Sequence, residues 1–286
     1  MSRVTTPTTG VELYYEISGV GDEWVTFIHG GLVDARSWGQ VPSRTGDIAR
    51  VLVYDSRGFG RSARPSTGYS VPEFVGDLCG LWDALGIERS HLIGFSQGGV
   101  TAQATTLEVP ERVSSMMLVG TFAYRTDAER AVAKDRASDA LRDGIGSQLT
   151  THVERVFAPG FATRHPDTVE TYLAPFLDND PSSFAQTMVA MSEIDLRPQL
   201  GSVRAPTTVV VGEHDRAVGA DHARRLHTLI PGARLIIVPG VGHTVHIEAP
   251  DVFMELVAAH LDWARQTDRG AEGTAPETHA GGGESR

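Results

Sequence analysis

Cysteine is almost absent from this chain. Cys79 is the only one in 286 residues, so no disulfide can form within the chain, which suits a reducing compartment. Because Cys79 stands in a helical pattern with Leu78 and Leu81, a small buried hydrophobic residue is a simpler interpretation than a catalytic thiol. The sequence also has no H-E-x-x-H motif and no cluster of Cys with His, so it predicts no metal site and no cofactor.

Long apolar runs and an excess of basic residues are lacking as well. No apolar run approaches the roughly 18 residues of a membrane span, and residues 1–10 contain no apolar segment of the kind a signal peptide has. The formal net charge is −11, whereas nucleic acids and anionic membranes attract basic surfaces. We therefore expect a cytoplasmic protein that binds a small molecule, not nucleic acid or membrane. The composition does not determine the oligomeric state.

What the chain does contain is a series of short apolar segments typical of buried strands. They occupy residues 11–17, 24–28, 50–54, 90–93, 114–120, 207–211 and 234–238. Helical patterns lie between several of them, including residues 70–85, where Ser70 and Glu73 form a capping box. Apolar strands that alternate with helices predict an α/β fold with a mostly parallel, doubly wound sheet of about eight strands.

The pattern changes between residues 122 and 203. No clear apolar strand occurs there, and several amphipathic segments are separated by prolines. We interpret residues 122–203 as an inserted helical lid, and residues 1–121 with 204–266 as the core of the fold. Residues 267–286 consist largely of Gly, Glu, Thr and Ala, which predicts a disordered tail.

Residues 92–99, Leu-Ile-Gly-Phe-Ser-Gln-Gly-Gly, contain the motif G-x-S-x-G. An apolar strand precedes it and a helical pattern follows, the context in which this motif forms a sharp turn that exposes a nucleophilic serine, here Ser96. Bulky neighbours would collide at such a turn, which accounts for Gly94 and Gly98. The helix that begins near Gln97 directs N–H groups and the positive end of its dipole toward the place where an oxyanion would form.

Asp215 and His243 stand just past the carboxyl ends of two later apolar strands. In a parallel sheet these ends share one edge, where ligands bind. A serine needs a base, and histidine serves near neutral pH when a carboxylate orients its other ring nitrogen. We therefore predict Ser96 as the nucleophile, His243 as the base and Asp215 as the orienting acid. Asp55 is an alternative acid, although hydrogen bonding within its own loop is the simpler interpretation.

Together these motifs resemble those of the α/β-hydrolase superfamily over about residues 10–266. The matching pieces are His29-Gly30 with Trp38, Asp55-x-Arg57-Gly58-x-Gly60-x-Ser62, Gly94-x-Ser96-x-Gly98-Gly99, Gly212-x-x-Asp215 and Gly242-His243. The resemblance implies a Ser-Asp-His triad and a helical lid before the strand that carries the acid. It also implies an oxyanion hole made by the backbone N–H groups of Gln97 and Gly31.

A serine nucleophile separates this chain from haloalkane dehalogenases and epoxide hydrolases, the relatives that use a carboxylate. We expect acyl transfer, with carboxylic esters and lactones leading the candidate substrates. Hydrolysis of a carbon–carbon bond in a vinylogous diketone is the alternative. Such relatives usually carry Gly-Pro-Gly after His-Gly and Met after the serine, where this chain has Gly31-Leu32-Val33 and Gln97. A non-hydrolytic ligand receptor or cofactor-free oxygenase on the same scaffold stays open.

The loops that carry the motifs also predict pocket walls. Leu32, Trp38 and Phe95 adjoin the catalytic loops, so we expect them to contact substrate. His29 is expected to brace its loop by hydrogen bonds, and His246 to be a structural residue. The aromatic residues of the lid can line a pocket or form the lid's own core, and the sequence favours neither.

Overall fold

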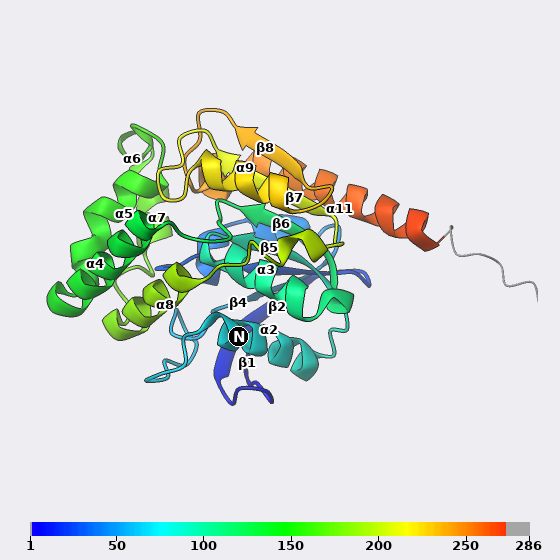
Figure 1. Ribbon diagram of the computed structural model, residues 1–286, viewed down its shortest axis with the longest axis horizontal. Coiled ribbons are helices and arrows are strands. Elements are labelled where there is room, and N and C mark those ends of the chain that lie inside the picture. Colours follow the sequence, from blue (N-terminus) through cyan, green and yellow to red (C-terminus); the bar gives the residue numbers. More distant parts are fainter. Residues whose placement is uncertain (1, 273–286) are drawn as a thin grey trace, which may run out of the picture.

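The computed structural model describes residues 2–272 and is built around an eight-stranded sheet (Figure 1). The strands are β1 (Ser2–Thr5), β2 (Glu12–Gly19), β3 (Trp24–Ile28), β4 (Arg50–Tyr54), β5 (Ser90–Phe95), β6 (Val113–Val119), β7 (Thr207–Gly212) and β8 (Arg234–Val238). Across the sheet they lie in the order β1-β2-β4-β3-β5-β6-β7-β8. β1 and β2 run antiparallel to their neighbours, and the pairs from β4 to β8 are parallel. The predicted fold class is confirmed.

β1 was not among the predicted strands. Residues 2–5 pair with residues 12–15 of β2 at the edge of the sheet. Ser2, Arg3 and Thr5 are exposed, so no apolar alternation marks this strand in the sequence.

Helices cover both faces of the sheet, and each face has its own apolar core. The helices packed there are α1 (Val41–Thr45), α2 (Val71–Leu85), α3 (Gln97–Glu108), α9 (Ala220–Leu229), α10 (Val245–Glu248) and α11 (Pro250–Glu272). α2, α3 and α9 contribute to one core, and α1 and α11 to the other. Successive residues of β5 point to opposite faces, so Leu92 lies in the first core and Ile93 in the second. Burial on both faces explains why the central strands are continuous apolar runs.

Between β6 and β7 the chain forms α-helices. They are α4 (Asp127–Asp143), α5 (Leu149–Val156), α6 (Phe161–Arg164), α7 (Pro166–Leu173) and α8 (Pro181–Glu193). These helices, green in Figure 1, lie together beside the sheet. Their apolar side chains form two small cores that also include Leu32 and Val33 from the loop after β3. We call residues 122–203 the helical segment; its role as a lid remains a prediction.

Four short 3-10 helices complete the described elements. They are η1 (Ala35–Trp38), η2 (Pro110–Arg112), η3 (Ile145–Gln148) and η4 (Leu200–Ser202). Within residues 2–272, no helix combines the length and the apolar character needed to cross a bilayer.

The C-terminal helix is longer than expected. The prediction of a disordered tail from residue 267 is wrong for residues 267–272, because α11 continues to Glu272. Asp268 in this extension forms an ion pair with Arg89 at 3.0 Å, and the Thr267 hydroxyl donates to the carbonyl of Trp263 at 3.0 Å. The ion pair ties the last turns to the body of the protein. Residues 273–286 of the predicted tail lie outside the described residues.

A buried ion pair joins the loop after β4 to α2. Arg57 donates from Nε and Nη2 to the two carboxylate oxygens of Asp77, each at 2.6 Å. Both side chains are almost completely buried. Arg57 also lies 3.6 Å from the partly exposed carboxylate of Glu73. Loss of Asp77 would therefore leave the buried guanidinium with one more distant, partly exposed partner, which costs more than loss of an exposed pair.

We predict that Asp77→Ala lowers the free energy of unfolding by about 3–5 kcal/mol, measured by urea denaturation. Asp83→Ala on the same helix is the matched control. Its half-exposed carboxylate pairs with Arg112 at 2.7 Å, and we expect a loss below about 1 kcal/mol. Equal losses in the two variants would contradict a special role for the buried pair.

Candidate active site

A sharp turn joins β5 to α3. Ser96 occupies this turn with φ 52° and ψ −115°, and among the non-glycine residues described only Leu32 also has a positive φ. A Cβ atom on Gly98 would collide with the carbonyl oxygen of Ile28, and one on Gly94 would lie 2.5 Å from the carbonyl oxygen of Gly98. β3, β5 and α3 therefore meet where glycines allow close approach.

Hydrogen bonds from the end of β6 hold the backbone of Ser96. Its N–H donates to the carbonyl of Val119 at 2.8 Å, and its carbonyl accepts from the hydroxyl of Thr121 at 2.6 Å. These contacts stabilise a backbone conformation that would otherwise be strained.

His243 and Asp215 form a buried hydrogen-bonded pair. The distance between His243 Nδ1 and Asp215 Oδ2 is 2.7 Å, and the two residues are only 3% and 8% exposed. The other oxygen of Asp215 accepts from the N–H groups of Ala217 and Val218, each at 2.9 Å. Burial raises the pKa of this carboxyl, but the charge and hydrogen bond of His243 and the backbone donors outweigh burial and hold the pKa below its usual value.

The ionisation of Asp215 determines the tautomer of His243. An ionised carboxylate can only accept hydrogen bonds, so His243 Nδ1 is the donor. In the neutral ring, Nε2 is then free of a proton and can accept one. The backbone N–H of His243 donates to the carbonyl of Val156 at 2.8 Å, so the helical segment also positions this residue.

One cavity brings most of the predicted site residues together. Ser96 and His243 both line it, together with Gly31, Gln97, Leu32 and Phe95. The empty space of the cavity is about 740 Å³, counting the space open to solvent at its mouth. The rest of its wall comes mainly from the helical segment.

Trp38 does not line this cavity. Its indole is fully buried and packs edge-on against Phe27 with a centroid distance of 5.0 Å. The ring of His246 lies 4.6 Å from it, and that of Phe95 lies 6.2 Å away. Burial lowers the pKa of His246 to about 3, so this ring is neutral and belongs to the aromatic core. Trp38 therefore supports Phe95, which itself faces the cavity.

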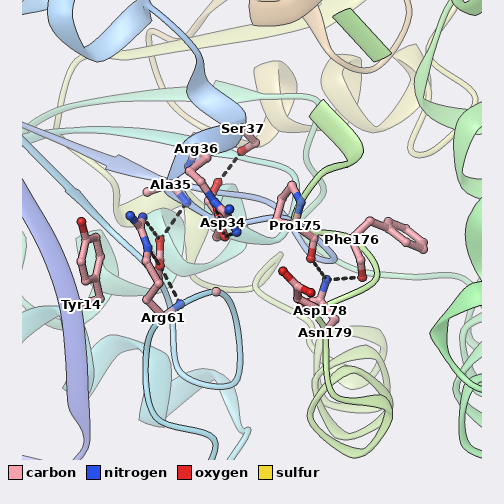
Figure 2. Close-up of polar contacts among 12 residues, drawn as sticks. Tyr14, Asp34, Ala35, Arg36, Ser37, Arg61, Pro175, Phe176, Asp178 and Asn179 are labelled. Atoms are coloured by element: carbon pink, nitrogen blue, oxygen red, sulfur yellow. Dashed lines mark hydrogen bonds and ion pairs between the residues drawn. The ribbon is translucent and has the colours of Figure 1, made fainter. Parts of the chain in front are cut away.

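The loop after β3 carries Gly31 and Leu32 into the cavity, and hydrogen bonds from side chains hold it. Asn179, before α8, donates from Nδ2 to the carbonyl of Leu32 at 3.0 Å. Asn179 Nδ2 also donates to Pro175 at 3.1 Å and to Phe176 at 2.8 Å (Figure 2). The helical segment thus contacts this loop where Leu32 has its positive φ.

The start of η1 fixes the same loop from the other side. Asp34 accepts from the N–H and the side chain of Arg36, and its carbonyl accepts from the hydroxyl of Ser37 at 2.7 Å (Figure 2). His29 Nε2 accepts from the N–H of Ser56 at 2.9 Å. His29 therefore braces the loop through a hydrogen bond.

The carboxylate of Asp55 is engaged by neighbouring residues. Its two oxygens accept from the N–H of Ala35 and from the N–H of Arg61, each at 2.9 Å, and Arg61 Nε adds an ion pair at 2.8 Å. The hydrogen bond to His243 comes from Asp215.

The charged residues of the cavity were not predicted from the sequence. Arg125, Arg136 and Arg155 line it from the loop before α4, from α4 and from α5. Their spacing matches no helical or strand period across the three elements, so no local pattern could group them. Only the packing of the helical segment brings them together.

Two other expectations concern groups away from the cavity. Cys79 is partly buried, and burial raises its pKa to about 11, so the thiol is protonated at neutral pH. In the part of the chain that the structure describes, no group of three or more His, Cys, Asp or Glu side chains is arranged to hold a metal ion.

Comparison with known proteins agrees with this architecture. Residues 23–250 match the family model described as alpha/beta hydrolase fold. A 3-oxoadipate enol-lactonase 2 from Acinetobacter baylyi is 28% identical over 250 residues, covering 87% of this chain and 92% of that protein. A 2-hydroxy-6-oxo-6-phenylhexa-2,4-dienoate hydrolase from Comamonas testosteroni is 30% identical over 270 residues, covering 89% and 91%.

A solved structure extends the likeness to three dimensions. The enol-lactonase from Burkholderia xenovorans LB400 superposes with a TM-score of 0.86 at 28% identity, covering 91% of this chain and 100% of that one. The sheet order, the turn at Ser96 and the matched family model therefore agree. The chain is an enzyme of the α/β-hydrolase family.

Proposed function

We propose that this enzyme is a serine hydrolase that cleaves a small-molecule carboxylic ester or lactone through an acyl-enzyme on Ser96. The observation that carries the proposal is the buried His243–Asp215 hydrogen bond of 2.7 Å beside a cavity that Ser96 and His243 both line. A nucleophile, a base and a group that orients the base are the parts that acyl transfer needs.

In the proposed reaction, His243 Nε2 takes the proton of the Ser96 hydroxyl as the oxygen attacks the substrate carbonyl. The same ring then gives this proton to the leaving oxygen, and the acyl-enzyme forms. His243 next activates a water that cleaves the acyl-enzyme and restores the serine. Asp215 keeps the proton on Nδ1 and stabilises the imidazolium that forms in each half of the reaction.

The proposed oxyanion hole uses two backbone N–H groups on opposite loops. Gln97 is the first residue of α3, so its N–H has no partner within the helix and lies at the positive end of the helix dipole. Gly31 lines the same cavity from the loop after β3. Both donors are held by backbone that is already folded, so they need little reorganisation as charge develops on the carbonyl oxygen.

We propose that the helical segment acts as a lid that selects the substrate. It supplies most of the cavity wall opposite the catalytic loops. The likeness to the enol-lactonases supports a lactone among the candidate substrates. Hydrolysis of a carbon–carbon bond is a second candidate, favoured by the similarity to the dienoate hydrolase. This chain has Gly31-Leu32-Val33 and Gln97 where carbon–carbon bond hydrolases usually carry Gly-Pro-Gly and Met, which favours the ester or lactone.

The first prediction from the proposed function concerns the nucleophile. A fluorophosphonate probe should label wild-type protein stoichiometrically on Ser96, as shown by peptide mass mapping, and should label neither Ser96→Ala nor His243→Ala. In a panel of p-nitrophenyl esters and lactones, Ser96→Ala should lose at least about 10⁴-fold in kcat. A folded wild type without adduct contradicts the proposal. Substantial turnover of the native substrate by Ser96→Ala would instead indicate non-hydrolytic chemistry on this scaffold.

The second prediction concerns the orienting acid. Asp215→Asn should lower kcat on a p-nitrophenyl ester by about 10⁴-fold, because an amide in this place no longer enforces the tautomer with the proton on Nδ1. Asp221→Asn is the control, since this exposed carboxylate pairs only with Arg224 at 3.3 Å among the residues described. Turnover that survives in Asp215→Asn would contradict the proposed role of Asp215 as the orienting acid.

The third prediction concerns the support of the oxyanion loop. Asn179→Ala removes the donor that holds the carbonyl of Leu32, so the Gly31 N–H should be less well placed. We expect kcat to fall about tenfold with a smaller change in KM, a fraction of the loss seen when an oxyanion donor itself is removed. Asp178→Ala, at the exposed neighbouring position, should leave kcat unchanged. A rise in KM alone would assign Asn179 to substrate binding.

A further inference from the structure

The wall of the cavity that faces the catalytic loops is positively charged. Arg125, Arg136 and Arg155 line it, and each is partly buried. The residues that line this cavity include no Asp or Glu. We refer to these three side chains as the arginine wall.

Among the residues described, the hydrogen-bond and ring-stacking partners of the arginine wall are neutral groups. The guanidinium of Arg125 lies 3.8 Å from the centroid of the Phe122 ring. Arg136 donates from Nε to Gln148 at 3.0 Å, and Arg155 donates from Nη2 to the carbonyl of Ala217 at 3.0 Å.

Other arginines of the helical segment behave differently. Arg142 and Arg197 are exposed and each pairs with a carboxylate, at 2.7 Å and 2.6 Å. Within residues 2–272, no carboxylate forms such a pair with the arginine wall. Since a guanidinium has five N–H donors, most donors of the arginine wall remain available.

The positive charges of the arginine wall are poorly compensated by the protein. Burial, and then the charges of Arg155 and Arg125, lower the pKa of Arg136 to about 10. Burial also lowers the pKa of Arg125 to about 10, although the charges of Glu129 and Asp215 oppose this shift. Both side chains stay charged at neutral pH. Partly buried charges that repel one another are costly unless a group of opposite charge joins them.

Other polar atoms of the cavity wall also lack hydrogen bonds within the part of the chain that the structure describes. Arg155 Nε, His152 Nε2 and Thr187 Oγ1 are buried and have no hydrogen-bond partner among the residues described. All three residues line the cavity. Burial, and then the charge of Arg136, lowers the pKa of His152 to about 3, so its ring is neutral. Orphaned buried polar atoms beside a charged wall indicate a place built for a polar ligand.

We propose that the substrate carries a carboxylate in addition to its ester or lactone bond, and that the arginine wall binds this carboxylate. The inference rests on the proposed function, because it assigns the substrate class of the same cavity. Guanidinium groups bind carboxylates through paired, charge-assisted hydrogen bonds, which suits the use of arginine here. The substrate then spans the cavity, with its reactive carbonyl at Ser96 and its carboxylate at the helical segment.

Two esters with the same leaving group test this inference. One is mono-p-nitrophenyl glutarate, which carries a free carboxylate, and the other is p-nitrophenyl 5-oxohexanoate, in which a methyl ketone replaces that carboxylate. Wild-type enzyme should show a kcat/KM at least about 10-fold higher for the glutarate ester, because each charge-assisted hydrogen bond contributes about that factor or more. Equal kcat/KM values for the two esters would overturn the proposal.

Variants assign the preference to the arginine wall. Arg136→Gln and Arg155→Gln should each lower kcat/KM for the glutarate ester by about 10- to 100-fold while changing that for the ketone ester little. Arg142→Gln, at an exposed position on the same helix as Arg136, should change neither. Equal losses on both esters would show a structural role and contradict carboxylate binding.

Binding of an unreactive dicarboxylate separates this inference from the proposed function. Calorimetry of wild-type enzyme and of Ser96→Ala should show glutarate binding and no binding of the neutral glutaramide. This measurement uses intact arginines and so needs no variant of the wall to fold. If wild-type enzyme cleaves neither ester but binds glutarate, the proposed hydrolysis fails and the anion site stands. If it cleaves both esters equally and does not bind glutarate, the anion site fails alone.

Discussion

The active-site edge of this protein depends on how closely β3, β5 and α3 approach one another. Gly94 and Gly98 meet backbone atoms at this junction, so any side chain there would push the elements apart. The close approach forces Ser96 into a backbone conformation that few non-glycine residues adopt, and hydrogen bonds from the end of β6 hold it there. A sheet packed on both faces supplies the rigidity that such a strained turn needs.

The helical segment and the catalytic loops form one connected unit. Asn179 binds the carbonyl of Leu32, and the carbonyl of Val156 accepts from the backbone of His243. Leu32 and Val33 are in turn part of the apolar cores of the helical segment. The helical segment and the loops that carry Leu32 and His243 are therefore positioned by the same contacts.

Charge inside the cavity and charge on the whole chain have opposite signs. The chain carries a formal net charge of −11, yet Arg125, Arg136 and Arg155 face the cavity without a carboxylate among its lining residues. Glu129 and Asp215 are the negative charges that act on Arg125. Glu129 is engaged by His222 and Thr126, and Asp215 by His243 and two backbone N–H groups. A buried site is governed by its few nearest charges, because solvent screens distant ones.

Local sequence determined the strands from β2 to β8, the turn at Ser96 and the places of Asp215 and His243 just past strand ends, because each depends on short-range features. Strand periodicity, the glycines around Ser96 and positions just past strand ends all act within a few residues. Tertiary structure alone decided that Trp38 packs behind Phe95, that residues 267–272 continue α11, and that the arginine wall faces the cavity. Those outcomes depend on which elements pack together. The helical segment brings its arginines into one cavity from separate elements, and the spacing of these arginines in the sequence follows no helical or strand period.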